Sequence, residues 1–237
     1  MSNQTFAFKQ FTVKQDKCAM KVGTDAVLLG AWANVSEAKN ILDVGTGTGI
    51  IALMLAQRKS VHVDAIDIDE AACVQAKENI EASPWKESVR IHHRSLQAFS
   101  KKATTKYDLI VSNPPYFVDS SKSHEEARTL ARHTDLLPYD ELLEGVLKLL
   151  SPVGKFCVVF PLKEGELFRD KAKDKKLHLT KLTRVHTRLD KSEKRLLMQY
   201  EFVPKTFSED HITIEQDTEH HYSEEYKQLT KDYYLHF

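Results

Sequence analysis

The sequence predicts an α/β fold in which helices cover both faces of a mostly parallel sheet. From residue 40 onward, short apolar segments alternate with segments of helical periodicity, the order that right-handed βαβ units produce. Three of the chain's eight glycines fall within five residues, between the first such strand and its helix. After Leu177 the alternation stops and two strand-like segments follow each other, which indicates an antiparallel hairpin at the sheet edge.

The expected elements follow from local pattern and from breakers. Runs of branched and aromatic apolar residues, too short for helices, predict five parallel strands at 41–44, 61–67, 89–93, 107–112 and 155–160. Helical spacing predicts helices at 50–57, 70–82, 139–150 and 164–173. Pro84 and Pro152 follow the second and third of these helices, where proline ends helical hydrogen bonding.

The carboxyl-terminal quarter differs in pattern. The hairpin strands are expected at 177–185 and 196–203, and tyrosines at 222, 226 and 233 recur at helical spacing, which predicts a last helix. We therefore expect a single domain over residues 1–237. It would comprise an N-terminal extension (1–39), an α/β core (40–205) and a tail with one helix (206–237).

Composition excludes several classes of protein. Hydrophobic residues make up 41% and charged residues 29%, which is typical of a globular chain and not of a disordered one. No segment approaches the roughly 18 apolar residues of a membrane span, and no basic segment followed by an apolar run begins the chain. Cys18, Cys73 and Cys157 are scattered and form no CxxC pair, as expected for reduced thiols. We expect a cytoplasmic protein without a membrane contact.

The charges are balanced overall but unevenly distributed. Net charge is zero, whereas residues 161–206 hold 13 basic against 7 acidic residues and residues 207–237 hold 2 against 8. Such asymmetry is compatible with a nucleic-acid face, and a solvated charged surface is the alternative. His211, His220 and His221 match no zinc spacing, so no metal is expected. Nothing in the sequence defines the oligomeric state, and a monomer is the simpler expectation.

The glycine cluster predicts a nucleoside site. It runs Asp43-Val44-Gly45-Thr46-Gly47-Thr48-Gly49 at the carboxyl end of the first strand, where doubly wound folds bind ligands. Glycine there lets a ligand approach the backbone closely, although a tight structural turn is the alternative. The spacing differs from that of pyrophosphate binders, and no Lys-Ser/Thr pair follows, which excludes a P-loop. Asp67 ends the second strand and could accept both ribose hydroxyls of an adenosyl group.

A second motif, Asn113-Pro114-Pro115-Tyr116, follows the fourth strand at the same edge. In isolation this tetrapeptide would predict only an extended turn. Beside a nucleoside site, the Asn113 side-chain oxygen and the Pro114 carbonyl could accept both N–H bonds of a planar amine, and Pro114 offers no competing donor. Tyr116 offers an aromatic face for a base that has left its stack.

Together, the glycine segment and this tetrapeptide resemble the class I S-adenosylmethionine (SAM) methyltransferases that alkylate planar nitrogens. The resemblance implies a Rossmann-like class I methyltransferase fold, with a seven-stranded, mostly parallel sheet and an antiparallel carboxyl-terminal hairpin. It implies SAM as cofactor and S-adenosylhomocysteine as product. It implies catalytic roles for Asn113, Pro114 and Tyr116. The cofactor contacts that it implies in the core are Asp43, Gly45, Gly47, Gly49, Asp67, Ile68, Ser95, Leu96 and Asn113.

The N-terminal residues narrow the resemblance. Residues 8–11, 18–25 and 28–32 look like the start of the bacterial tRNA methyltransferases that form N6-methyladenosine at position 37 of valine tRNA. The resemblance to this family also covers residues 83–85, 113–116, 126–134 and 222–237. The resemblance implies that Lys21, Gly23, Thr24 and Asp25 cover the methionine end of SAM. One departure is Ser95, because many relatives place an acidic residue there to accept from the SAM adenine amine.

A tRNA substrate would need a phosphate-binding surface. Arg128 and Arg132 follow the tetrapeptide, and Lys175, Lys176 and Arg188 belong to the basic segment, so these five cations are the expected RNA contacts. Three alternatives stay open: another nucleic-acid amino-methyltransferase acting on rRNA or DNA, a protein glutamine N5-methyltransferase, and a non-catalytic SAM- or RNA-binding module. The second family has a longer N-terminal domain than the roughly 40 residues present here, and intact Asn113 and Tyr116 count against the third.

Overall fold

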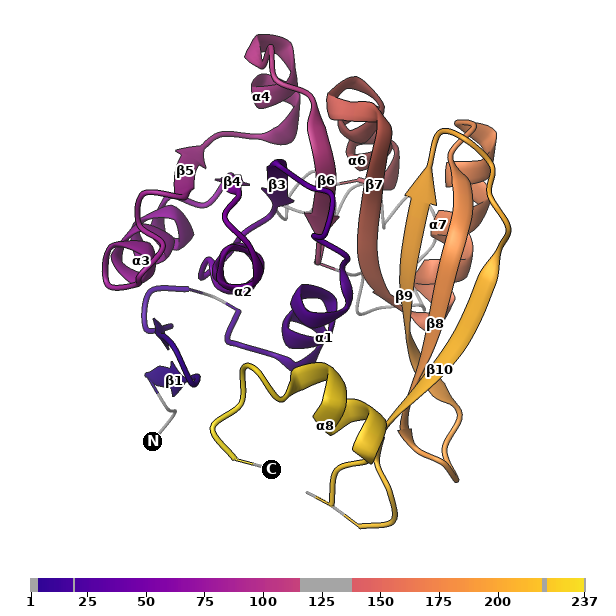
Figure 1. Ribbon diagram of the computed structural model, residues 1–237. Helices are drawn as coiled ribbons and strands as arrows, with labels where there is room; N and C mark the ends of the chain where they lie inside the picture. Colours follow the sequence, from indigo (N-terminus) through magenta and orange to yellow (C-terminus); the bar gives the residue numbers. More distant parts are fainter. Residues whose placement is uncertain (1–3, 19, 116–137, 219–220, 237) are drawn as a thin grey trace, which may run out of the picture.

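The computed structural model describes residues 4–18, 20–115, 138–218 and 221–236, and it contains one large twisted sheet (Figure 1). Its eight strands lie in the order β10-β8-β9-β7-β6-β3-β4-β5. Their bounds are β3 Asn40–Val44, β4 His62–Asp67, β5 Val89–His93, β6 Tyr107–Ser112, β7 Leu150–Pro161, β8 His178–Arg188, β9 Glu193–Glu201 and β10 Ser208–Glu215. Strands β5, β4, β3, β6 and β7 are mutually parallel, and β9 is antiparallel to both β7 and β8. The expected mostly parallel sheet with an antiparallel hairpin is confirmed.

Helices bury both faces of the sheet, which explains why its central strands are continuously apolar. One hydrophobic cluster packs α1 (Thr24–Trp32) and α2 (Ile50–Arg58) against the sheet, with Ile80 of α3 (Glu70–Glu81) at its border. The other packs α4 (Leu96–Lys102), α6 (Tyr139–Leu149) and α7 (Leu162–Asp174) against the opposite face. Along β6, Leu109 and Val111 enter the first cluster and Ile110 the second, as the two-residue period of a strand requires.

The sheet has one more strand than expected, because the tail adds β10. This strand pairs in parallel with β8 and forms the sheet edge, so the β8–β9 hairpin lies inside the sheet. The sequence of β10, SEDHITIE, is acidic and mostly exposed, which hides the alternation that predicts strands. Charged residues are common on edge strands because they discourage pairing with other chains. The tail then forms α8 (Glu224–Thr230), which includes Tyr226, whereas Tyr222 and Tyr233 lie just outside the helix.

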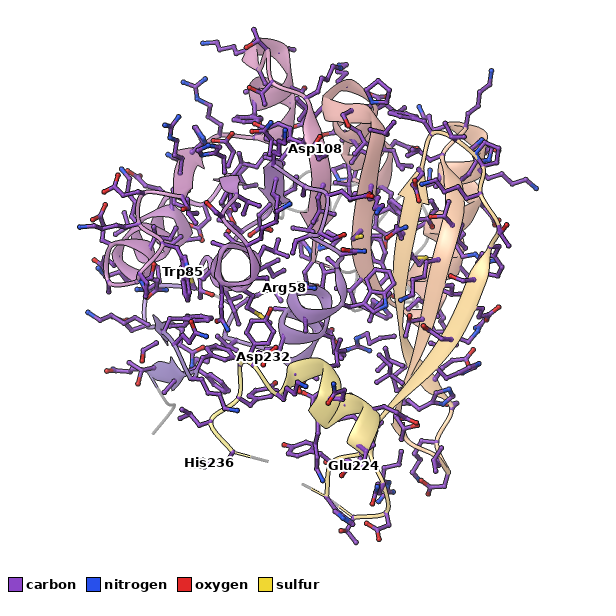
Figure 2. The ribbon with its side chains drawn as sticks, viewed as in Figure 1. Arg58, Trp85, Asp108, Glu224, Asp232 and His236 are labelled. Atoms are coloured by element: carbon purple, nitrogen blue, oxygen red, sulfur yellow. The ribbon has the colours of Figure 1, made fainter. Side chains whose placement is uncertain are left out.

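The two ends of the chain lie side by side. A small antiparallel hairpin, β1 (Thr5–Ala7) with β2 (Thr12–Lys14), begins the described chain. The Lys9 N–H donates to the Tyr233 carbonyl at 2.8 Å, and the Tyr233 hydroxyl donates to the Met54 carbonyl of α2 at 3.2 Å. Figure 2 shows Asp232 of this tail beside α1 and α2, near Arg58. The tail is therefore fixed to the first helix layer.

Strand direction decides which residues lie at the edge of the sheet formed by the carboxyl ends of the parallel strands. Parallel strands β3, β4, β6 and β7 all end at one edge, and the pairing of Pro161 with Arg195 puts the start of β9 there too. Strand β8 runs antiparallel to β9, so it ends at this edge with Arg188. The α7–β8 connection lies at the top of Figure 1 and the β8–β9 turn at the bottom, with α8. Among the described residues, no helix is long and apolar enough to cross a membrane.

Helices α4 and α6 approach closely at one glycine. A Cβ built on Gly145 of α6 would collide with Cγ and Cδ2 of Leu96, the first residue of α4. The contact involves Cγ of the buried Leu96 as well as its methyl groups, so rotation of the methyl groups alone would not relieve it. Glycine at this position therefore allows the two helices to pack directly.

We expect Gly145→Ala to destabilise the protein by about 1–3 kcal/mol, the scale of an overpacked core. The sign of this change in the free energy of unfolding is informative, because replacing glycine by alanine in a helix interior otherwise stabilises a protein by up to about 1 kcal/mol. Urea denaturation measures the difference, with Lys148→Ala on the exposed face of α6 as control. A Gly145→Ala protein more stable than the wild type would refute the close packing.

Candidate active site

The glycine turn follows β3 and is held in shape by the end of β4. Gly45, Gly47 and Gly49 all have positive φ, at 73°, 54° and 82°, which L side chains rarely adopt. The N–H groups of Gly45 and Thr46 both donate to the Ile66 carbonyl of β4, at 2.9 and 3.0 Å. A Cβ on Gly45 or Gly47 would meet no atom within 4 Å. These two glycines thus leave bare backbone next to open space.

Asp43 acts from beneath the turn. Its side chain is fully buried, and one carboxylate oxygen accepts from the Thr46 hydroxyl at 2.6 Å. Burial raises the pKa of Asp43 to about 7, with the charge of Asp67 adding to the effect and the Thr46 hydrogen bond opposing it. The residue was predicted to touch the cofactor. The structure shows it supporting the turn from inside.

Asp67 joins the second strand to the turn. Its Oδ2 accepts from the Gly47 N–H at 2.8 Å, and its Oδ1 accepts from the Asp69 N–H at 3.0 Å. A carboxylate has about four lone-pair sites, so both oxygens can still accept from a ligand. The side chain is half-buried at the end of β4, as expected from the sequence.

A cavity of about 460 Å³ opens beside Asp67. Its walls include the predicted residues Ile68, Ser95 and Leu96, together with Pro114. Ser95 is the N-cap of α4, and its hydroxyl oxygen accepts from the Ala98 N–H at 3.2 Å. The hydroxyl thus has a structural role in addition to facing the cavity. The volume lies within the range of about 300–1,000 Å³ of small-molecule pockets.

Asn113 lies where this cavity meets a larger one. It directly follows β6, whose last residue, Ser112, donates its hydroxyl to the Val44 carbonyl at 2.9 Å. Among the described residues, the buried Oδ1 of Asn113 has no hydrogen-bond partner. Leaving such an acceptor unpaired costs about 1–3 kcal/mol, which a donor from a ligand would recover.

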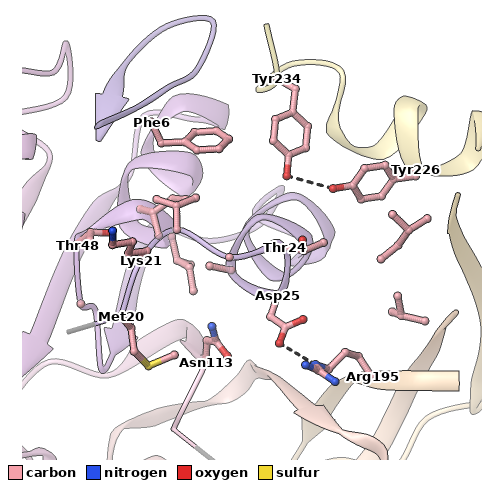
Figure 3. A pocket seen from close by; sticks show the side chains of 18 of the residues that line it. Phe6, Met20, Lys21, Thr24, Asp25, Thr48, Asn113, Arg195, Tyr226 and Tyr234 are labelled. Atoms are coloured by element: carbon pink, nitrogen blue, oxygen red, sulfur yellow. Dashed lines mark hydrogen bonds and ion pairs between the residues drawn. The ribbon is translucent and has the colours of Figure 1, made fainter. Parts of the chain in front are cut away.

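The second cavity, of about 970 Å³, surrounds the start of α1 (Figure 3). Lys21, Gly23, Thr24 and Asp25, the residues predicted to cover the cofactor, all line it. The Asp25 carboxylate accepts from Nε of Arg195 at 2.7 Å. This ion pair joins α1 to β9 across 170 positions of sequence. The glycine turn, Met20 and Asn113 border both cavities.

The residues predicted to bind RNA do not lie together. Arg188 lies at the site edge, where it pairs with Asp190 at 3.4 Å. Lys175 and Lys176 precede β8 and lie at the opposite edge, about 35 Å away for a strand of 11 residues. Lys175 lies 3.6 Å from Glu144. Tyr116, Arg128 and Arg132 are outside the described residues. Counting charges along the sequence puts Lys175, Lys176 and Arg188 in one basic segment. In the structure the two lysines precede β8 and Arg188 ends it, so they lie at opposite ends of that strand.

Several side chains at the site were not among the predicted contacts, although Lys194 and Arg195 belong to the basic segment that was compatible with a nucleic-acid face. Arg195, Lys194 and the exposed Met20 border the larger cavity, and so do Phe6 and three tyrosines of the tail. Tyr222 and Tyr226 were recognised only as part of a helical repeat that packs on the domain, and Tyr234 was not part of that repeat. No local signal could have located Arg195, because its position depends on the pairing of β9 with β7. Among the described residues, no group of three His, Cys, Asp or Glu side chains could hold a metal ion.

Comparison with known proteins agrees with this arrangement. The family model for the methyltransferase small domain matches residues 18–160. A crystal structure of a predicted O-methyltransferase from Agrobacterium tumefaciens superposes with a TM-score of 0.70 over 88% of this chain and 96% of that one, at 13% identity. That similarity concerns the fold alone. Together, the fold, the glycine turn and the family match define the class of this protein, which is a methyltransferase.

Two curated relatives specify the family. The tRNA1(Val) (adenine(37)-N6)-methyltransferase of Parabacteroides distasonis is 48% identical over 99% of both chains. The enzyme of the same name from Trichodesmium erythraeum is 44% identical, again over 99% of both chains. The chain belongs to the family of tRNA1(Val) (adenine(37)-N6)-methyltransferases.

We expect the raised pKa of Asp43 to make stability depend on pH. Because the folded protein binds this proton more tightly than the unfolded chain does, the free energy of unfolding should fall as pH rises from about 4 to about 7. The slope attributable to Asp43 approaches about 1.4 kcal/mol per pH unit. Asp43→Asn stays neutral and still accepts from Thr46, so it should lose this part of the slope.

Urea denaturation of the ligand-free protein at several pH values measures that difference. Asp108→Asn is the matched control, because Asp108 is an acceptor for the backbone N–H groups of Lys39 and Asn40 at the far edge of the sheet. Figure 2 shows Asp108 at the end of the molecule opposite Glu224 of the tail. If wild type and Asp43→Asn give parallel curves, Asp43 does not titrate in this range.

Proposed function

We propose that this protein transfers a methyl group from SAM to the exocyclic N6 amine of adenine 37 in valine tRNA. The curated relatives, which carry that activity in their names and match over nearly the whole chain, support the substrate. The single observation that carries the chemistry is the buried, unpaired Oδ1 of Asn113, at the junction of the two cavities. Such a substrate also favours the expected cytoplasmic location.

The residues at the smaller cavity fit an adenosyl group. Asp67 has free lone pairs at the end of β4 for the two ribose hydroxyls, and bare backbone at Gly45 and Gly47 allows close approach. Ser95 offers a neutral hydroxyl for the adenine, with Leu96 and Ile68 as apolar walls. Lys21 and the N-terminal end of α1 face the larger cavity, where a carboxylate of the methionine end would find positive charge.

Asn113 and Pro114 would orient the target amine. The lone pair of an adenine amine is delocalised into the ring, so the amine is a weak nucleophile. Two acceptors, Asn113 Oδ1 and the Pro114 carbonyl, would hold both N–H bonds and favour a pyramidal nitrogen with its lone pair free. SAM, when bound, supplies a methyl group on an already activated sulfonium. The methylated amine then releases its extra proton to water, so positioning dominates the rate.

The target adenine must leave its stack to reach this site. Tyr116, which follows the described part of the tetrapeptide, would provide an aromatic face for the base. Arg128 and Arg132, outside the described residues, and Arg188, Lys175 and Lys176 remain proposed phosphate contacts.

The proposal is tested with purified protein, radiolabelled SAM and a valine tRNA transcript. We expect one N6-methyladenosine per transcript, and none in a transcript with guanine at position 37. Asn113→Ala removes one of two acceptors and should slow single-turnover transfer by roughly 100-fold or more, while SAM affinity changes little. Transfer at the normal rate by Asn113→Ala would contradict the mechanism, and a guanine-37 transcript methylated equally well would contradict the target.

The cofactor assignment predicts that Asp67→Ala weakens SAM binding by roughly 1.5–3 kcal/mol, the scale of lost charge-assisted hydrogen bonds. Asp108→Ala is the matched control, since Asp108 also accepts from two backbone N–H groups but at the far edge of the sheet. Calorimetric titration with SAM measures both affinities. Equal SAM affinity in folded Asp67→Ala and Asp108→Ala would remove Asp67 from the ribose site.

A further inference from the structure

The larger cavity has more room than a methionine chain needs. Its volume of about 970 Å³ is at the top of the range of pockets that hold a whole small molecule. The adenosyl part of SAM has the smaller cavity, so only the methionine end of the cofactor would enter the larger one. Much of the larger cavity is therefore left for another ligand.

The walls of this remaining space come from both ends of the chain. Phe6 of β1, with Tyr222, Tyr226 and Tyr234 of the tail, forms an aromatic side, and Lys194 and Arg195 of β9 form a basic side. We call these six residues the tail subsite. Figure 3 shows Tyr226 and Tyr234 on one side of α1, and Asn113 on the other. The tail subsite and Asn113 line one continuous cavity.

The aromatic side is built into the fold. Tyr226 is 2% exposed, so it supports this side from behind, and its hydroxyl donates to the Tyr234 hydroxyl at 3.1 Å. Tyr222 stands 5.4 Å from Tyr226 between ring centroids and is half-buried. Hydrogen bonds of Tyr233 to Met54, and of Asp232 to Gln57 at 2.9 Å, fix the tail to α2. Rigid aromatic faces of this kind lose little entropy when a base stacks on them.

The basic side suits an anion. Most cations of the neighbouring strands have acidic partners: Lys181 pairs with Asp210, Arg184 pairs with Glu193 and Glu209, and Arg188 and Lys191 share Asp190. Within the described chain, Lys194 has no ion-pair partner, and it is exposed at the cavity mouth. Arg195 neutralises Asp25, so that carboxylate would repel an approaching anion less.

We propose that the tail subsite binds a nucleotide adjacent to the target adenine, with its base against the half-buried Tyr222 and Tyr234 and its phosphate at Lys194. Aromatic faces beside cations are the means by which proteins bind unpaired nucleic acid. Because one cavity joins Asn113 to the tail subsite, a strand that places its adenine at Asn113 could place a neighbour there. The inference rests on the proposed function and identifies a second contact for the same RNA.

Filter binding of the valine tRNA transcript over a salt series, with S-adenosylhomocysteine present, tests the basic side. We expect Lys194→Gln to raise the RNA dissociation constant and to flatten its salt dependence by about 0.7 units of slope, as for one lost single-strand phosphate contact. Lys191→Gln is the control, because Lys191 lies on the same hairpin but pairs with Asp190 and does not line the cavity. Identical slopes and affinities in the two variants would overturn the phosphate contact.

Abasic substitution tests the aromatic side. Tyr222→Ala should weaken RNA binding roughly 5- to 100-fold, the scale of one stacked base, while SAM affinity stays unchanged and Tyr222→Phe restores binding. An abasic residue 5′ or 3′ of the target adenine should weaken RNA binding by the wild type by a similar factor. The same abasic residue should weaken RNA binding by Tyr222→Ala far less, because that variant has already lost the stacking partner. Gln228→Ala, at an exposed position of α8 that does not line the cavity, should behave as wild type.

The outcomes separate this inference from the proposed function. If the wild type methylates valine tRNA but neither neighbouring base is coupled to Tyr222, the tail subsite does not hold a base. If Tyr222→Ala and Lys194→Gln weaken SAM and leave RNA binding unchanged, the larger cavity belongs to the cofactor alone. If the wild type methylates no tRNA, the proposed function itself fails. Thermal unfolding of each variant shows whether it is folded, and the exposed Lys194 provides a test that does not alter the packed tail.

Discussion

The structure of the site depends on the hydrogen bonds that hold the glycine turn between β3 and β4. The Ile66 carbonyl accepts from two successive N–H groups, and Asp67 accepts from a third at Gly47. Asp43 holds the Thr46 hydroxyl from below. Three glycines at positive φ would otherwise have a large conformational freedom, which these contacts remove. Both cavities border this turn, so its shape fixes the distance between the donor site and Asn113.

Holding the glycine turn in this way costs free energy, because the carboxyl group of Asp43 is buried beneath it. Asp43 is dehydrated beneath the turn, and its carboxyl gains a single short hydrogen bond in return. Asp67, half-buried at the end of the neighbouring strand β4, carries the lone pairs that a ribose could use. The two acids therefore divide the work: one shapes the backbone, and the other faces the ligand. The sequence motif contains both acids but does not reveal which of them supports the turn and which faces the cavity, because that depends on how deeply each side chain is buried.

The parts of the protein that could be predicted from sequence are those fixed by local pattern and strand direction. Gly45, Asp67 and Asn113 lie at or just after the carboxyl ends of parallel strands, which meet at one edge of the sheet. Their positions relative to the predicted strands were therefore enough to place them together. Strand β10 escaped prediction because its exposed acidic residues conceal the two-residue period. Lys175 and Arg188 looked like one basic segment, yet β8 separates them by its whole length. Long-range pairing, which no local pattern encodes, decided the first case, whereas the second follows from the length of a single strand.

The glycine turn and the tail side of the cavity pair are built from different kinds of contact. Residues 43–49 and 66–69 bond mainly to one another and to adjacent strands, so a short motif can specify them. The wall formed by Phe6, Arg195 and the tail tyrosines instead needs contacts between chain ends, such as Arg195 with Asp25 and Lys9 with Tyr233. Those contacts form only when the whole domain is folded. A methyl-donor site on such a fold can therefore stay constant while changes in the tail alter which substrate fits beside it.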